Sequence, residues 1–308
     1  MKSTREYPTA SVLDVNIDAV NMQQAIERVA AELASSRKGY VCLTGVHGVM
    51  EAHRDRELAR IFAGAALVVP DGMPTVWVGR HQGHSQMERV AGPDLMLEVI
   101  QREEFRDRTH FLCGGRAGIA DELRSTLVKR YPWVKIVGTY CPPFGPMSAI
   151  EEREFIGRVN TLRPDIVWVG ISTPKQERFM ALYLPLLDTK LMFGVGAAFD
   201  YHTGRIADCA EWIKRCGLQW LDRLLQDPKH LWKRYLRNNP AFLYAIALQL
   251  ARSSLRGNVI RRPASPPPIS DGLVVRSPGT APDCPVTSGG ETVMKQRQFP
   301  DNIAGRPA

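Results

Sequence analysis

Residues 165–177, with the sequence DIVWVGISTPKQE, constrain the fold more than any other stretch of the chain. The apolar run 165–170 is rich in β-branched residues, which is typical of a strand buried on both faces of a parallel sheet. The run ends at Gly170, and Thr173 followed by Pro174 then predicts a helix start, with Thr173 as the N-cap. A strand that leads through a short turn into a helix favours an open α/β sheet.

Three polar residues at this helix start, Lys175, Gln176 and Glu177, follow the carboxyl end of the predicted strand. Ligands of open α/β sheets bind at this position, so these side chains are candidates for ligand contact. The plain alternative is an ordinary strand–helix turn with a solvated polar helix start, and these residues alone leave both interpretations open.

The same alternation of strands and helices continues along the first 200 residues. Apolar runs predict the strands, and apolar residues at helical spacing predict the helices between them. Strands are predicted over 11–16, 39–43, 66–69, 109–112, 134–137, 165–170 and 191–195, and helices over 22–34, 49–63, 74–79, 94–102 and 149–162. This order predicts an α/β fold with a Rossmann-like, mostly parallel sheet and helices on both faces.

The loops after the predicted strands should meet at one rim of this sheet, where a ligand site is expected. They contain Thr44, Asp71, Gly114, Tyr140, Gln176 and Asp200. Asp71 could accept the proton of an attacking hydroxyl, although an Asp-Gly pair is often only a turn. Asp200 could bind a ribose or a base, and Gly114 could let the backbone approach a phosphate, but turns explain both residues as well.

The composition changes after about residue 206. Residues 212–237 are rich in Arg, Lys, Trp and Leu and predict two basic amphipathic helices that separate near Asp227-Pro228. A second break is expected at Asn239-Pro240, followed by a short apolar helix. After Arg262 the chain is rich in Pro, Ser and Gly, which predicts a disordered tail. We therefore divide the chain into an α/β core (10–206), a basic helical appendage (207–262) and a tail (263–308).

The net charge of +8 favours an anionic partner, which could be nucleic acid, a membrane surface or a phosphorylated substrate. The six cysteines form no C-x-x-C pair and are typical of reduced thiols in a cytosolic protein. The N-terminus lacks the apolar region of a signal peptide, and no run has the length of a membrane span. We expect a cytoplasmic protein whose membrane contact would be peripheral.

Several cofactor and metal motifs are missing from the sequence. It contains no G-x-G-x-x-G after a strand, no Walker A motif, no H-E-x-x-H and no paired carboxylates at a strand end. We therefore expect a site that uses no metal and no cofactor. Arg89 precedes a helix start at Pro93-Asp94 and is either a diphosphate contact or a solvated arginine.

A set of motifs that covers about residues 10–245 resembles the WecG/TagA/CpsF glycosyltransferases. The motifs are PDG (70–72), RVAGPDL (89–95), FLCGG (111–115), GTYCPPFG (138–145), VGISTPKQE (169–177), GVGAAFDYHTGRI (194–206) and GLQWLDRLLQDPKHLWKRYL (217–236). The P-K-Q-E and G-x-G-x-x-F-D pieces in this order are the most specific part of the resemblance.

The resemblance implies an enzyme of bacterial cell-surface or exopolysaccharide biosynthesis. Such an enzyme moves an N-acetylmannosamine-type sugar from a UDP donor to a polyprenyl-diphosphate-linked sugar, with inversion and without an obligatory metal. It works at the inner face of the cytoplasmic membrane. We expect no nucleic-acid partner for this chain, and a homo-oligomer is possible.

The resemblance also implies roles for residues of this chain. Asp71 matches the proposed base, and Thr44 and Arg89 match positions of the catalytic pocket. Gly114, Tyr140, Gln176 and Asp200 fall at the nucleotide, and Arg223, Arg234 and Arg237 fall in the basic segment that closes the site and binds diphosphate. A leaving diphosphate without a metal needs such cations, and the basic helices with the apolar residues 242–246 suit a membrane surface.

Two positions depart from the family pattern. Val46 stands where many members have Asn, so His47 could supply the missing polar group or be a structural histidine. Asp208-Cys209-Ala210 stands where many members have Arg-Ala-Pro. Two other interpretations stay open: a catalytically idle paralogue, and a nucleic-acid-binding module suggested by the basic charge and interleaved aromatic residues.

Overall fold

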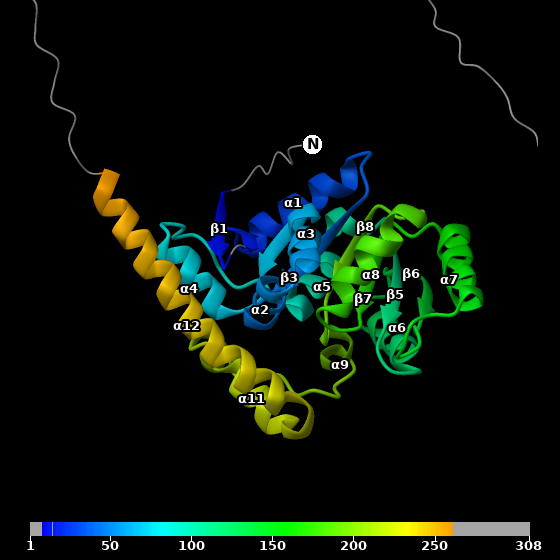
Figure 1. Ribbon diagram of the computed structural model, residues 1–308. Coiled ribbons are helices and arrows are strands. Elements are labelled where there is room, and N and C mark those ends of the chain that lie inside the picture. Colours follow the sequence, from blue (N-terminus) through cyan, green and yellow to red (C-terminus); the bar gives the residue numbers. More distant parts are fainter. Residues whose placement is uncertain (1–7, 14, 261–308) are drawn as a thin grey trace, which may run out of the picture. The chain divides into compact units, whose positions relative to one another are not determined.

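The computed structural model describes residues 8–13 and 15–260, with side chains through Arg252 (Figure 1). Its main sheet has six strands in the order β4-β3-β8-β7-β5-β6, and every neighbouring pair is parallel. The strands are β3 (Gly39–Thr44), β4 (Leu67–Pro70), β5 (Thr109–Gly114), β6 (Lys135–Tyr140), β7 (Ile166–Gly170) and β8 (Leu191–Gly194). The predicted parallel α/β sheet is confirmed, and parallel strands place all six carboxyl ends at one edge.

Two hydrophobic cores lie on opposite faces of this sheet. Side chains alternate along each strand, so that in β7 Val167 and Val169 pack into one core while Ile166 and Trp168 pack into the other. The first core is covered by α2 (Val46–Arg54), α3 (Arg56–Gly64), α4 (Met73–His81), α7 (Ala149–Leu162) and α8 (Lys175–Tyr183). The second is covered by α1 (Met22–Ala34), α5 (Gly92–Gln101), α6 (Ile119–Arg130) and α9 (Ala198–His202), and the 3-10 turns are η1 (Glu103–Phe105) and η2 (Leu184–Leu186). Burial on both faces explains why the strands are continuous apolar runs.

The prediction of one strand over 11–16 was wrong. The chain forms an antiparallel hairpin of β1 (Thr9–Val12) and β2 (Val15–Asp18), which is a separate two-stranded sheet. Leu13 adopts a positive φ of 48°, and the chain reverses there. The Asp18 carboxylate accepts a hydrogen bond of 2.7 Å from the Val68 amide, which fixes the hairpin to edge strand β4.

The single helix predicted over 49–63 is two helices, α2 and α3, that meet at Asp55. The Asp55 carboxylate accepts hydrogen bonds from the backbone N–H groups of Glu57 (2.8 Å) and Leu58 (3.3 Å). An N-cap of this kind starts a new helix, which explains why the apolar pattern alone overlooked the break. The start of α8, in the stretch 165–177, was predicted one residue too early. Thr173 was expected as the N-cap, but Pro174 is the N-cap and Lys175 is the first helical residue.

The appendage contains α10 (Glu211–Arg215), α11 (Gln219–Gln226) and α12 (Pro228–Ile260). The predicted separation near Asp227-Pro228 is confirmed, but the break at Asn239-Pro240 is wrong because α12 continues through Pro240. An interior proline costs a helix roughly 3 kcal/mol. Tertiary packing offsets this cost, because Phe242 and Ile246, on the next turns, are buried in the core that α2 also enters.

The appendage packs on the α/β core, so the described residues form one compact unit. That the segment 207–262 has a function of its own stays a prediction. The predicted tail, 263–308, lies outside the described residues.

Candidate active site

The carboxyl ends of β3, β4, β5, β7 and β8 border a cleft of about 1420 Å³. Its floor includes Gly45, Asp71, Gly115, Gly170 and Gly196, each at the end of a strand or just after it. Helices α4, α8, α11 and α12 supply the walls. The rim at which a site was expected therefore borders a large concave surface.

Asp71 lies at the floor of the cleft directly after β4, and its N–H donates to the Thr44 carbonyl at 2.9 Å. Burial raises the pKa of the Asp71 carboxyl to about 6, even though Arg89 acts to lower it. The charge of Asp94 also raises this pKa, and a hydrogen bond from the Gly92 N–H lowers it. A carboxylate with this pKa is suited to accept a proton near neutral pH.

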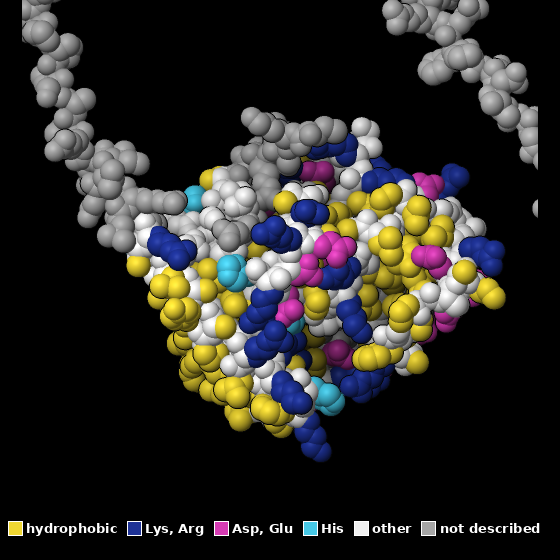
Figure 2. Space-filling model, in the orientation of Figure 1, with side chains coloured by type: hydrophobic (Ala, Val, Ile, Leu, Met, Phe, Trp, Pro, Cys, Tyr) yellow, Lys and Arg dark blue, Asp and Glu magenta, His cyan; other side chains and the backbone are white. Residues whose placement is uncertain are grey.

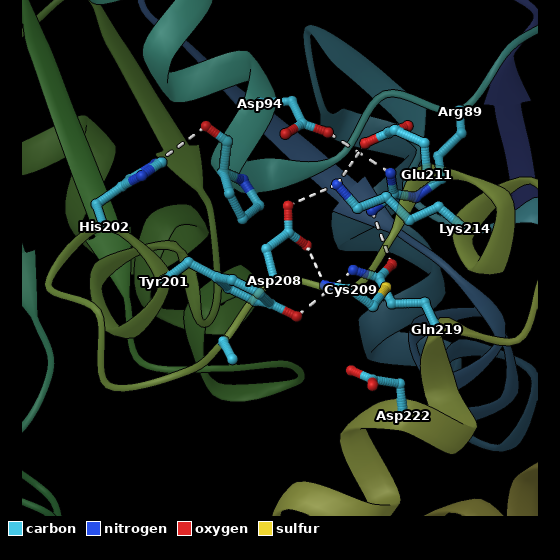
Figure 3. A network of polar contacts seen from close by, with 12 residues as sticks. Arg89, Asp94, Tyr201, His202, Asp208, Cys209, Glu211, Lys214, Gln219 and Asp222 are labelled. Atoms are coloured by element: carbon cyan, nitrogen blue, oxygen red, sulfur yellow. Dashed lines mark hydrogen bonds and ion pairs between the residues drawn. The ribbon is translucent and has the colours of Figure 1, made fainter.

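Arg89 connects the floor of the cleft to the appendage (Figure 3). Its guanidinium donates to the Gln219 side-chain oxygen at 2.8 Å and lies 3.5 Å from the Asp94 carboxylate. Gln219, at the start of α11, in turn donates to the Tyr201 hydroxyl at 3.4 Å. The predicted pocket residue Arg89 is therefore held from both sides, close enough to Asp71 to affect its pKa.

A smaller cavity of about 170 Å³ adjoins this network and shares Arg89, Tyr201, Lys214 and Gln219 with the main cleft. The Lys214 ammonium is buried and contacts Asp208 at 2.6 Å and Glu211 at 2.7 Å (Figure 3). Burial acts to lower the pKa of Lys214, but the hydrogen bonds to the two carboxylates raise it overall. Asp208, one of the departures from the family pattern, thus pairs with a lysine six residues later.

Gln176 is buried, and its side-chain amide is bonded to the backbone around the end of β8. The amide nitrogen donates to the Gly194 carbonyl and the amide oxygen accepts from the Gly196 N–H, both at 3.0 Å. The nitrogen also lies 3.0 Å from Glu177 Oε1 and 3.3 Å from Thr173 Oγ1. Gln176 lines the cleft but uses its polar atoms to fix the turn after β8, which places Asp200 downstream.

His47 lies in the first turn of α2 and joins three segments. Asn238 of α12 donates to its Nδ1 at 3.0 Å, and its Nε2 is 3.3 Å from the Thr173 carbonyl. Burial lowers the pKa of His47, and the positive charge of Arg234 lowers it further. A neutral imidazole with both nitrogens engaged fits the structural interpretation, while the ring still lines the cleft.

Two of the three arginines predicted to bind diphosphate reach the cleft. Arg223 lies over the Tyr201 ring with 5.4 Å to its centroid, and Arg234 lies over the Tyr235 ring at 4.9 Å. The Arg234 Nε is buried without a hydrogen-bond partner among the described residues. Arg237 is exposed and does not line the cleft. Sequence reasoning missed Arg116, which lines the cleft, although it stands directly after the FLCGG motif.

Thr44, Gly114 and Tyr140 do not line the cleft themselves. Thr44 is buried beneath α2, where a Cβ on Gly48 would come within 2.2 Å of its hydroxyl. The Tyr140 ring packs on Phe155 at 4.9 Å, and its hydroxyl contacts the Met147 sulfur at 3.5 Å. The residues that line the cleft are instead their neighbours: Gly45, Gly115 and the loop after Tyr140.

Asp200 lies in α9 and lines the cleft. Within the described part of the chain, its carboxylate makes no hydrogen bond or ion pair, so it is available to a ligand. Glu177 differs, because it is fully buried and its Oε1 accepts from Thr173 Oγ1 at 2.8 Å. Its Oε2 has no partner among the described residues, and burial raises the pKa of this carboxyl.

The outer surface of the appendage is unusually apolar. Figure 2 shows hydrophobic side chains gathered along the surface that α12 forms, with Lys and Arg beside them. The exposed apolar residues include Trp212, Leu225, Trp232, Leu236 and Tyr244. Among the described helices, none is both long enough and apolar enough to span a membrane.

The amino-acid sequence is similar to those of known glycosyltransferases. A profile described as "Glycosyl transferase WecG/TagA/CpsF family" matches residues 10–256. The chain is 27% identical over 186 residues to the N-acetylglucosaminyldiphosphoundecaprenol N-acetyl-beta-D-mannosaminyltransferase of Bacillus subtilis (strain 168), which covers 60% of this chain and 70% of that protein. A Staphylococcus aureus (strain MRSA252) protein of the same name is 24% identical over 240 residues, 77% of this chain and 91% of that protein. The similarity includes both the core and the appendage.

Proposed function

The chain belongs to the WecG/TagA/CpsF glycosyltransferase family, and we propose that it transfers an N-acetylmannosamine-type sugar from a UDP donor to a polyprenyl-diphosphate-linked sugar. The names of its relatives, which are mannosaminyltransferases acting on a diphosphoundecaprenol-linked sugar, support this choice of sugar and acceptor. The product would enter a bacterial cell-surface polysaccharide or exopolysaccharide.

The observation that carries the proposal is the position of Asp71. A carboxylate at the floor of a large cleft, with its pKa raised to about 6 by burial, can act as the general base of the transfer. Arg89 beside it acts to lower this pKa and so favours the ionised form that a base requires.

In the proposed reaction, the acceptor hydroxyl oxygen attacks the anomeric carbon from the face opposite the diphosphate. The bond between that carbon and the diphosphate oxygen breaks, and its electron pair leaves with UDP. The hydroxyl proton passes to the Asp71 carboxylate. A single in-line displacement of this kind inverts the anomeric configuration.

The leaving diphosphate needs positive charge to stabilise it. Arg223 and Arg234 line the cleft from α11 and α12. The Nε of Arg234 has no hydrogen-bond partner among the described residues, so its N–H can donate to a diphosphate oxygen. We assign these two residues to the diphosphate and Asp200 to the nucleoside, and Gln176 to holding the turn between them. Arg237 is assigned to the outer surface, because it is exposed and off the cleft wall.

The acceptor lipid supports a position at the inner face of the cytoplasmic membrane. A polyprenyl chain is embedded in the bilayer, so the enzyme has to work at its surface. The exposed Trp232, Leu236 and Tyr244 beside Lys229 and Lys233 have the apolar and cationic character that suits an anionic lipid surface.

One experiment tests this function. A panel of UDP-sugars is offered with N-acetylglucosamine-diphosphate-prenyl acceptors, and released UDP is measured. We expect release with an N-acetylmannosamine donor that depends on the acceptor and is lost in Asp71→Asn. Absence of release with every donor would contradict the proposal and favour an idle paralogue.

A second experiment tests the nucleic-acid alternative. Salt-dependent retention on DNA without retention on anionic vesicles would favour that alternative.

A further inference from the structure

The cleft extends beyond the candidate active site into an apolar branch between α4 and α12. Its lining there is mostly hydrophobic: Met73, Trp77 and Val78 come from α4, with His81 at the end of that helix, and Phe242, Leu243, Ile246 and Leu250 come from α12. Phe242, Ile246 and Val78 are buried, whereas Trp77 and Leu243 are 48% and 68% exposed. We call this branch the apolar groove.

Contacts at both ends of the groove fix α4, and the contact at the far end also fixes α12. Near the active site, the Trp77 ring of α4 packs so closely on Gly217, just before α11, that a Cβ there would lie 2.6 Å from it. At the far end, Gln82, which ends α4, and Gln249 of α12 both donate to the Ser11 carbonyl at 2.7 Å. The groove is therefore built into the fold and does not result from a loose helix.

The apolar groove begins at the proposed base. Helix α4 starts two residues after Asp71, with Gly72 as its N-cap, and its nine residues extend about 13 Å away from the carboxylate. On the opposite wall, α12 presents the apolar Leu231 at its start, then Arg234 and Asn238, and then only Phe242, Ile246 and other apolar residues as far as Leu250. Cationic and polar groups therefore lie near Asp71, and hydrophobic groups follow over about 12 Å of α12, counted from Phe242 to Leu250.

From this polarity order we infer that the apolar groove binds the first isoprene units of a polyprenyl diphosphate, next to its diphosphate. A prenyl diphosphate has the same order, with a dianionic head followed directly by a branched hydrocarbon. The inference rests on the proposed function for its acceptor, and it adds a protein site for a part of the lipid that would otherwise be assigned to the bilayer. The alternative occupant is an acyl chain of an anionic membrane lipid, and the comparison with vesicles below distinguishes it from the prenyl chain.

Binding of prenyl diphosphates in buffer without vesicles tests the inference. Dimethylallyl, geranyl and farnesyl diphosphate contain one, two and three isoprene units, and calorimetry gives the affinity of the full chain for each. We expect the affinity to rise with chain length, by about tenfold or more from one unit to three, because each buried methylene adds favourable transfer free energy. An affinity that does not depend on chain length would overturn the inference.

Two leucines of α12 provide a matched pair of variants. Leu243 lines the groove and is 68% exposed, and Leu236 lies off the cleft and is 67% exposed. Leu243→Gln should reduce the chain-length effect to less than about threefold. Leu236→Gln should keep the chain-length effect and weaken only retention on anionic vesicles. Because both side chains are exposed and Gln is a good helix former, both variants should fold, as circular dichroism can verify.

The outcomes also separate this inference from the proposed function. Chain-length-dependent binding that Leu243→Gln abolishes supports the groove even if no UDP-sugar is turned over. Equal losses in both leucine variants, seen only with vesicles, would show that the bilayer holds the lipid and would overturn the inference. Transfer that proceeds equally well with one-unit and three-unit acceptors would also overturn it, and would leave the proposed function intact.

Discussion

The guanidinium of Arg89 donates a hydrogen bond of 2.8 Å to the side chain of Gln219, 130 residues later in the chain. Arg89 also acts to lower the pKa of Asp71, so one side chain touches the appendage and tunes the proposed base. The position of the appendage and the protonation state of Asp71 are thereby linked.

Replacement of Asp71 tests the proposed base directly. Asp71→Asn should reduce turnover by roughly 10²–10⁴-fold, the usual range for loss of general-base catalysis. The affinity for UDP, measured by calorimetry, should stay close to that of the unchanged protein, because the proposed UDP contacts are other residues. A variant that keeps more than about a third of the turnover would remove Asp71 from this role, since that loss is far below the expected range.

The pH profile of kcat/KM tests the influence of Arg89. The base must be ionised, so kcat/KM should fall as the pH decreases below about 6, the pKa of Asp71. Arg89→Met removes a charge that lowers this pKa, so the acid limb should move to higher pH. Arg89→Lys keeps the charge and serves as the control, with a smaller displacement of the limb. An unchanged limb in Arg89→Met would show that Arg89 does not act on the base.

Gln176 and Asp200 should respond differently to substitution by Ala. Gln176→Ala leaves the Gly194 carbonyl and the Gly196 N–H without their partner, so the free energy of unfolding should fall by about 1–3 kcal/mol. Asp200→Ala removes no protein contact of the carboxylate and should weaken UDP binding without loss of stability. Chemical denaturation and calorimetry of both variants measure the two effects. Equal stability losses would contradict the separate roles.

His110 should make the protein less stable in acid. It is 2% exposed, its Nδ1 accepts from the Trp168 indole at 3.1 Å, and burial lowers its pKa from 6.5 to about 4. The unfolded chain binds a proton between these pH values and the folded chain does not, so stability present above pH 6.5 is lost as the pH falls to 4. The loss is about 3 kcal/mol from this group.

The variant His110→Asn isolates this contribution, because its side-chain oxygen can still accept from Trp168 and it does not titrate. Denaturation by urea at pH 7.5 and at pH 5 should show a smaller difference for the variant than for the unchanged protein. An identical difference would mean that other groups cause the acid sensitivity.

Truncation tests how far the core depends on the appendage. The sequence alone separates an α/β core, 10–206, from the appendage, but Leu231, Phe242 and Ile246 of the appendage are buried in the structure. Burial of such side chains contributes about 1.5–3 kcal/mol each. A chain that ends at Ile206 should therefore unfold at clearly lower temperature in circular dichroism. A chain that ends at Arg262 is the control and should unfold like the full chain.

The parts of the fold that the sequence predicts are those with a local periodic signal. The parallel strands are continuous apolar runs, and Asp71 was found because it directly follows one of them. The hairpin was missed because its two arms are short and their apolar residues, Val12 and Val15, also fit one strand. The continuation of α12 was missed because local propensity against Pro240 is overridden by burial of the following turns.

The contacts that complete the candidate site have no such signal. Asn238 donates to His47 from 191 positions away, and no pattern in either segment of the sequence predicts this contact. The fixed role of Gln176 likewise depends on the turn at Gly196, and only the folded chain shows that its amide is fully bonded. Motif resemblance found the residues near the cleft, but only the structure distinguished those that line it from those that support it.

The Ser11 carbonyl, which accepts from both Gln82 and Gln249, has a consequence for the order of events during synthesis. The contact to Gln249 spans 238 positions, so α12 can pack on the hairpin of β1 and β2 only after nearly the whole described chain has been synthesised. At 5–20 residues per second this delay is about 12–48 s on the ribosome. One wall of the cleft is consequently missing from a nascent chain until α12 has been synthesised.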